Sequence, residues 1–237
     1  MIDYLKAAKI HMEGDGLRII TQNSFGYGDI LRLMAYAKSL MLSSSRKVHV
    51  TYVLPPHYPW SYQYEHNIHY ALSQFNLLTT YDVEITSLDT YAHKYTNLLK
   101  KEYAEQVAAW LGYPKLTPKH SSSDGDYLCV WTSWTNLSPV SKDKMPINKD
   151  KFESFLKTLD IPIKMVDYRM NIAETFDTIR NSKLCLGYEG MGQQIAYHYG
   201  KPIITMSNLV QVSKNTGGPE SRITNDLKTV RRYLNVH

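Results

Sequence analysis

One segment, residues 183–208, constrains the fold of this chain more than any other. It reads KLCLGYEGMGQQIAYHYGKPIITMSN: an apolar run, a turn with three glycines, a helix-length stretch, a Gly-Lys-Pro stop and a second apolar run. The order strand, glycine-rich turn, helix and strand is the repeating unit of a parallel α/β sheet. In such a sheet the turn lies at the carboxyl end of a strand, and the helix that follows presents its unpaired N–H groups there.

The glycine turn is a candidate anion site. Gly187, Gly190 and Gly192 lack a Cβ, so their backbone can approach a phosphate or adopt a positive φ. The positive end of the following helix favours an anion, and Glu189 is placed to accept hydrogen bonds from a ribose diol. A nucleoside diphosphate is therefore the expected ligand. The alternative is a tight turn between two buried elements, because short glycine motifs also occur by chance.

The same pattern occurs near the start of the chain. Residues 17–21 (LRIIT) predict a strand, 24–29 (SFGYGD) a glycine turn, and 30–42 a helix with apolar residues at helical spacing. Asp29 falls at the N-cap or first turn, where a carboxylate stabilises the helix without any catalytic role. Residues 47–54 predict the next strand, which would pair in parallel with the first through this helix.

The polar segment 119–126 (KHSSSDGD) predicts a linker, and 237 residues suffice for two compact domains. We place the domains at 1–124 and 125–237, with 1–16 as a polar lead-in. After the linker, strands and helices alternate again and end in a basic amphipathic helix, NDLKTVRRYLN; the expected elements are strands at 127–132 and 163–166 and helices at 149–159 and 172–179. The predicted fold class is α/β, with two Rossmann-like domains facing a cleft.

Composition narrows the class of protein. The chain is 43% hydrophobic and 21% charged, as expected for a globular protein, and its net charge of +5 suggests an anionic partner. Cys129 and Cys185 lie inside apolar runs and are expected to be buried free thiols in a reducing compartment. No apolar run reaches membrane-spanning length, and the N-terminus lacks the apolar core of a secretion signal. We therefore expect a soluble, cytoplasmic protein without integral membrane association.

Aromatic and histidine residues gather between 57 and 70. His66 and His69 are spaced to share a helix face, but no third ligand is evident nearby, and zinc sites normally have three or four. No metal site is predicted. The rings, Trp60 among them, are better suited to form the wall of an acceptor pocket for a sugar or base. A further helix is expected at 96–110.

Three segments resemble GT-B glycosyltransferases of the ADP-heptose (lipopolysaccharide heptosyltransferase) type, in the same order along a shorter chain. Residues 24–30 resemble the family's Ser-x-x-Gly-Asp turn. Residues 131–159, with Lys144 before a proline, are similar to the segment that opens its C-terminal domain. Residues 187–202 resemble its donor loop, Gly-x-Asp-Thr-Gly-x-x-His-x-Ala-x-Ala-x-x-x-Pro, with Glu189 in place of the aspartate.

The resemblance implies an inverting transferase that uses a nucleotide sugar as substrate and needs no cofactor. It makes residues 1–124 the acceptor-binding domain and 125–237 the donor-binding domain. Asp29 would be the catalytic base. The acceptor-side residues would be Ser24, Tyr27, Gly28 and Trp60. The donor-binding residues would be Lys144, Glu189, Gly190, Met191, Gly192, Gln193 and Gln194.

The sequence leaves several alternatives for the acceptor and for the function. A hydroxymethylated base in duplex DNA is preferred, because basic charge can follow phosphates and the nineteen tyrosines can stack on bases. A lipid-linked or soluble saccharide is the alternative acceptor. A non-catalytic nucleotide-binding module is another possibility, since Gly190-Met191 and Gln194 replace the family's Thr-Gly and His. An NAD-dependent enzyme is disfavoured, because neither glycine turn fits G-x-G-x-x-G.

Overall fold

The chain divides into two compact units, residues 1–119 and 120–237, which are described separately. The boundary falls within the polar segment that predicts a linker. The computed structural model describes residues 8–21, 27–54, 61–86, 115–135, 145–167, 169–188, 190–207 and 222–235. The predicted helix at 96–110 lies outside these ranges. In the described residues, no helix is both long and apolar enough to cross a membrane.

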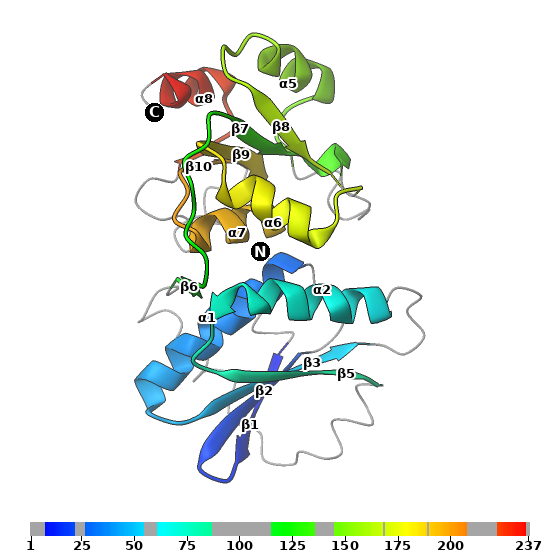
Figure 1. Ribbon diagram of the computed structural model, residues 1–237, viewed down its shortest axis with the longest axis vertical. Helices are drawn as coiled ribbons and strands as arrows, with labels where there is room; N and C mark the ends of the chain where they lie inside the picture. The colour runs from blue at the N-terminus through cyan, green and yellow to red at the C-terminus, as the bar shows by residue number, and fades with distance from the viewer. Residues whose placement is uncertain are drawn as a thin grey trace. The chain divides into compact units, whose positions relative to one another are not determined.

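Unit 1 is a four-stranded sheet with two helices on one face (Figure 1). The strands, in spatial order, are β1 (Ala8–Glu13), β2 (Gly16–Thr21), β3 (Val48–Leu54) and β5 (Thr80–Ile85). Strands β2, β3 and β5 run parallel, which confirms the predicted βαβ unit. The helices are α1 (Tyr27–Ser44) and α2 (Ser61–Ser73). A small antiparallel pair, β4 (Phe75–Asn76) and β6 (Thr117–Pro118), completes the described part of the unit.

Four strands of unit 1, namely β1, β4, β5 and β6, were not predicted. The expected lead-in contains β1, which pairs antiparallel with β2 through a tight turn where Gly14 has φ of 58°. Only glycine adopts that conformation without cost, so the turn that closes this hairpin depends on Gly14. Strand β5 is largely half-buried, so its sequence lacks the apolar run that marks β3.

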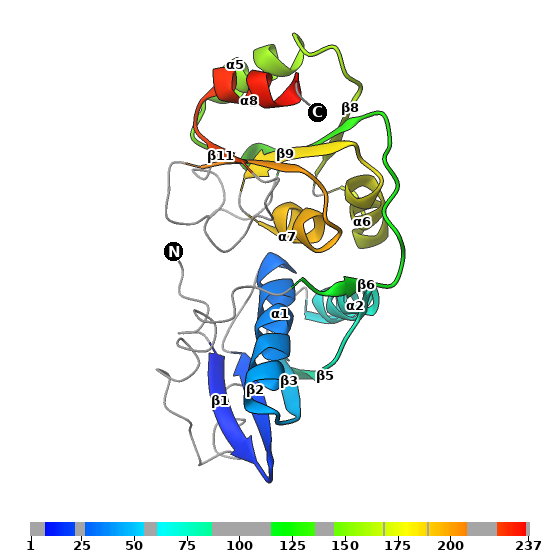
Figure 2. The same ribbon diagram turned by 90° about the vertical axis from the view of Figure 1, so that its left-hand side faces the viewer.

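Unit 2 is a five-stranded parallel sheet with helices on both faces. Its strands are β7 (Leu128–Trp131), β8 (Ile163–Val166), β9 (Leu184–Tyr188), β10 (Ile203–Met206) and β11 (Arg222–Thr224). Figures 1 and 2 show α5 (Lys149–Leu156) and α8 (Leu227–Leu234) on one face and α6 (Ile172–Arg180) and α7 (Met191–His198) on the other. The parallel α/β sheet is confirmed. Strand β11, however, was not predicted from the sequence.

The strand order identifies the architecture of unit 2. The sheet runs β8-β7-β9-β10-β11, so the first strand in sequence is second in space and the later strands extend to the other side. This is the 2-1-3-4-5 order of doubly wound, flavodoxin-like sheets. Every residue of β7, β9 and β10 is buried, as expected for parallel strands covered on both faces.

The Gly-Lys-Pro stop ends α7 as predicted. Gly200 has φ of 71° and its N–H donates to the Tyr197 carbonyl, while the Lys201 N–H donates to the Ala196 carbonyl at 2.9 Å. This is a Schellman cap, which satisfies two of the last helical carbonyl groups.

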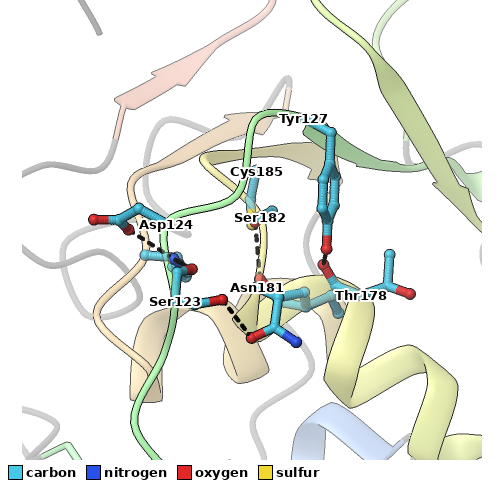
Figure 3. Close-up of polar contacts among 9 residues, drawn as sticks. Ser123, Asp124, Tyr127, Thr178, Asn181, Ser182 and Cys185 are labelled. Carbon is cyan, nitrogen blue, oxygen red and sulfur yellow. Dashed lines mark hydrogen bonds and ion pairs between the residues drawn. The ribbon is translucent and has the colours of Figure 1, made fainter.

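The predicted linker is anchored to unit 2 (Figure 3). The buried ammonium of Lys201 donates to the Ser123 carbonyl at 2.7 Å and pairs with the Asp124 carboxylate at 3.0 Å. The Ser123 hydroxyl donates to Asn181 Oδ1, and the Gly125 N–H donates to the Asn181 carbonyl. A Cβ at Gly125 would lie 2.2 Å from that carbonyl oxygen, so only glycine fits. The end of the linker therefore belongs structurally to unit 2.

Candidate functional site

The candidate site lies at the topological switch point of unit 2. Strand β7 pairs with β8 on one side and with β9 on the other, and the connections that follow β7 and β9 lead to helices on opposite faces. In doubly wound sheets, ligands bind at the carboxyl ends of the two strands where the order reverses. Here those ends are Trp131 and Tyr188. The glycine turn singled out in the sequence follows Tyr188 directly.

Trp131 explains two of the three glycines in that turn. A Cβ at Gly187 would lie 2.3 Å from the indole ring, and one at Gly192 would lie 2.6 Å from it. The indole Nε1 donates to the Tyr188 carbonyl at 2.7 Å, and the residue is 5% exposed. Gly187 and Gly192 therefore make room for the indole ring. The sequence-based explanation, a close approach of the backbone to phosphate, is not needed at these two positions.

Gly190 is different, because neither space nor backbone conformation requires a glycine there. Its φ of 167° is extended, and a Cβ would meet the Tyr188 ring at an ordinary 3.4 Å. It is the N-cap of α7 and provides no side-chain hydrogen bond to the helix. The other described α-helices of unit 2 are capped by side chains: Asn148 for α5, Asn171 in a capping box for α6, and Asp226 for α8. At the switch point, the N-cap residue of α7 thus offers its helix no side-chain acceptor, unlike the N-cap residues of these three helices.

The two glutamines predicted to contact the donor are buried. Gln193 is 1% exposed and its Nε2 donates to the Thr205 hydroxyl of β10 at 3.0 Å. Gln194 is also buried, and its N–H makes an intrahelical bond to the Gly190 carbonyl. Met191, the first residue of α7, is half-buried. The edge of the site is therefore formed by Gly190 and Met191, while Gln193 holds α7 against the sheet.

In unit 1, Asp29 lies in the first turn of α1, at the carboxyl end of β2. This is the helix-start position that the sequence predicted, and Gly28 beside it is buried. One turn further on, Arg32 is only 4% exposed, although arginine is seldom buried unless it is paired. Sequence reasoning missed Arg32. Its signal was a lone cation within the apolar run 30–37.

Several predicted residues lie outside the described part of the chain. Ser24, Trp60, Lys144 and Glu189 fall outside the described ranges, as do the side chains of Tyr27 and Asp29. Their roles stay predictions.

The predicted histidine pair lies on α2, with both side chains exposed. The His69 ring is 3.1 Å from the Tyr81 hydroxyl through Nδ1. Among the described residues, no group of three or more His, Cys, Asp or Glu side chains is placed to hold a metal ion.

The two cysteines face each other across β7 and β9, and both are buried free thiols, as predicted. A hydrogen bond with Cys185 and burial raise the pKa of the Cys129 thiol well above its usual value. Cys129 therefore stays protonated at neutral pH, which makes it a packing residue and a poor nucleophile.

Comparisons with known proteins found no match: no protein-family model, no curated protein and no solved structure matched the chain.

Proposed function

We propose that this protein is an inverting glycosyltransferase whose unit 2 binds a nucleoside diphosphate sugar between the ends of β7 and β9. One observation carries the proposal: the switch point of a doubly wound sheet coincides with the glycine turn and with the one described α-helix of unit 2 whose N-cap residue makes no side-chain hydrogen bond. Unit 1 would supply Asp29 as the catalytic base. This division of roles is that of GT-B glycosyltransferases, which three segments of the sequence resemble.

The chemistry assigns a task to each group. Asp29 would remove the proton of the acceptor hydroxyl as that oxygen attacks the anomeric carbon. The departing diphosphate develops negative charge, which the N–H groups at the start of α7 and the ammonium of Lys144 would stabilise. Glu189 would accept hydrogen bonds from the ribose. A fixed cation at the diphosphate would make a divalent ion unnecessary.

For the acceptor, we propose a hydroxymethylated base in duplex DNA. The positive net charge supports it, because phosphates would be attracted to the protein. A lipid-linked or soluble saccharide is the alternative acceptor.

The first experiment is a thermal-shift screen with UDP, GDP, ADP and CDP and their sugar conjugates. A ligand that binds the folded protein stabilises it by about 2.7 kcal/mol at 100 times its Kd. We expect one nucleotide base to raise Tm clearly more than the others. If no nucleotide raises Tm at millimolar concentration, the proposal is wrong.

The second experiment measures release of the nucleoside diphosphate from the best donor, with hydroxymethylated duplex DNA as acceptor. Asp29→Asn should keep the donor-induced Tm shift and lose turnover by about a hundredfold or more, the usual worth of a general base. Unmodified duplex of the same sequence is the matched control, since it lacks the acceptor hydroxyl.

A second candidate, a nucleotide-binding module without turnover, has one observation in its favour. The indole ring of Trp131 accounts for Gly187 and Gly192, so two glycines of the turn are explained by packing. Binding of a nucleotide without release of product from any acceptor, with Asp29→Asn indistinguishable from the unmodified protein, would favour this candidate.

A further inference from the structure

The groove between α5 and α8 in unit 2 has no role in the proposed transfer. It is open, with a volume of about 380 Å³, and its described lining is Phe155, Leu227, Lys228, Arg231, Arg232 and Asn235. Three of these side chains are cationic, one is an amide, and none is acidic. The surface therefore offers hydrogen-bond donors and positive charge.

The cations form one face of α8. Positions 228, 231, 232 and 235 follow helical spacing, so their side chains lie together along about two turns. The opposite face packs inward, where Val230 is completely buried. Like charges three or four residues apart repel each other, so these cations form a positive stripe. A bound anion would reduce the repulsion between them. The only carboxylate of this segment, Asp226, is engaged in capping the helix through the Lys228 and Thr229 N–H groups.

The stripe is held firmly at its centre. The Arg231 Nη2 donates to the Thr158 hydroxyl, and its guanidinium lies over the Phe155 ring, 5.6 Å from the centroid. Phe155 is 8% exposed, so the ring is not free to stack on a base. The ordered guanidinium lowers the entropy cost of binding an anion.

We propose that this face of α8 binds the phosphodiester backbone of nucleic acid. Lys228, Arg231 and Arg232 would contact successive phosphates, without reading the bases. Guanidinium groups form bidentate hydrogen bonds with phosphate oxygens. Contacts with the phosphodiester backbone need neither an exposed ring nor a deep pocket. The proposal does not depend on glycosyl transfer, because the groove uses different residues from the donor site.

The test is fluorescence anisotropy with a labelled 20-base-pair duplex at several salt concentrations. Each phosphate contact contributes about −0.9 to the slope of log K against log salt. The full chain is compared with the double variant Lys228→Gln/Arg232→Gln, which keeps Arg231 and its packing. We expect the slope of the variant to be shallower by about 1.8 than that of the unmodified protein. Raising salt from 50 to 200 mM should therefore reduce the variant's affinity for the duplex by a factor about 12 times smaller.

Arg46→Gln/Lys47→Gln is the matched control. It removes one arginine and one lysine from exposed positions of unit 1, so the net charge changes equally. The control should retain the slope of the unmodified protein. An unchanged Tm for both variants shows that folding is intact.

Three results would overturn the proposal. The first is no binding of duplex at 50 mM salt, and the second is an equal change of slope in both variants. The third is loss of binding to phosphatidylserine vesicles or to a polyglutamate peptide in the α8 variant while duplex binding persists, which would assign the face to a membrane or an acidic protein. None of these outcomes alters the nucleotide thermal shift that tests the donor site.

Discussion

The two units use their sheets differently. In unit 2, helices cover both faces, and every residue of the three central strands is buried. In unit 1, α1 and α2 cover one face, where the Tyr52 hydroxyl donates to the Ile30 carbonyl of α1. The other face carries a polar cluster: Asp82 accepts from Arg18 at 3.4 Å and lies 3.1 Å from His49 Nε2.

This difference shows where each unit can bind a ligand. A sheet buried on both faces has only its carboxyl edge available, so a site in unit 2 must lie at the strand ends and helix starts. The polar face of unit 1 tolerates charge because neighbouring strands pair it: the Arg18 Nη1 also donates to Thr51 Oγ1 at 2.8 Å, and His49 Nδ1 lies 2.7 Å from Thr80 Oγ1. Four predictions test or refine this contrast.

The largest effect is expected in the core of unit 2. Trp131→Ala should lower the free energy of unfolding by about 3–5 kcal/mol, because it leaves a cavity against Gly187 and Gly192. Gly187→Ala should cost about 1–3 kcal/mol, because its Cβ would overlap the indole ring. In the Trp131→Ala background the same Gly187→Ala change should cost far less. Calorimetry of the four proteins measures the coupling, and simple additivity would show that the ring is not the reason for the glycine.

The next effect concerns the polar face of unit 1. Asp82→Ala should lower the free energy of unfolding by about 1–2 kcal/mol, between the values of exposed and buried ion pairs, because the carboxylate is partly exposed. Asp15→Ala, at the exposed hairpin turn, is the control and should stay within about 0.5 kcal/mol. Equal effects from urea denaturation of the two variants would mean that the cluster adds nothing to stability.

A smaller change in stability should accompany a large change in binding at α7. Gly190→Asp introduces a side-chain cap and a favourable charge, which should stabilise the protein by about 0.3–1 kcal/mol. The same carboxylate would repel a diphosphate, so the nucleotide-induced Tm shift should disappear. Gly190→Ala adds neither cap nor charge and should keep the shift. If Gly190→Asp still responds to nucleotides, the start of α7 is not the phosphate site.

The smallest effect is the pH dependence of a charged cap. The hydrogen bond from the Lys228 N–H, with those from Thr229, holds the pKa of Asp226 below its usual value. A lowered pKa gives stability that is fully present above the unfolded pKa of about 3.9 and is lost as pH falls through the folded value. The loss of Tm caused by Asp226→Ala should therefore be full at pH 6 and shrink toward pH 2.

Asn148→Ala in α5 is the matched comparison, because Asn148 caps its helix without a charge. Its Tm penalty should not vary with pH over the range that affects Asp226. Parallel pH profiles for the two variants would contradict the electrostatic explanation of the α8 cap.

Much of the secondary structure was predictable because its signals are local. The strands at 17–21, 47–54 and 203–206 appear where apolar runs predict them, and the helix expected at 172–179 forms as α6. The strands β1, β4, β5, β6 and β11 were missed. Strands β1, β5 and β11 each lie at the edge of a sheet and pair with one neighbour, and β4 pairs with β6 in a two-stranded sheet. Their pairing depends on partners that a local pattern does not specify.

Some features of the candidate site were likewise predictable from the local sequence, and others were not. The glycine turn, the helix after it and the position of Asp29 at the start of α1 follow from residue order. The meaning of the individual glycines does not, because Trp131 contacts a strand 57 residues later in the chain. The burial of Gln193 and Arg32 likewise depends on which elements pack against α7 and α1.

Local sequence patterns suffice to predict two successive α/β units, each with a helix that begins after a glycine turn, since hydrophobic periodicity and turn chemistry act over a few residues. The order β8-β7-β9-β10-β11, and with it the switch point, is set by the packing of the folded chain. The same packing explains why Gly187 and Gly192 accommodate a ring, whereas Gly190 is an N-cap residue that offers its helix no side-chain acceptor. Strand order and side-chain packing depend on contacts between segments far apart in the chain, and these contacts exist only once the sheet has formed.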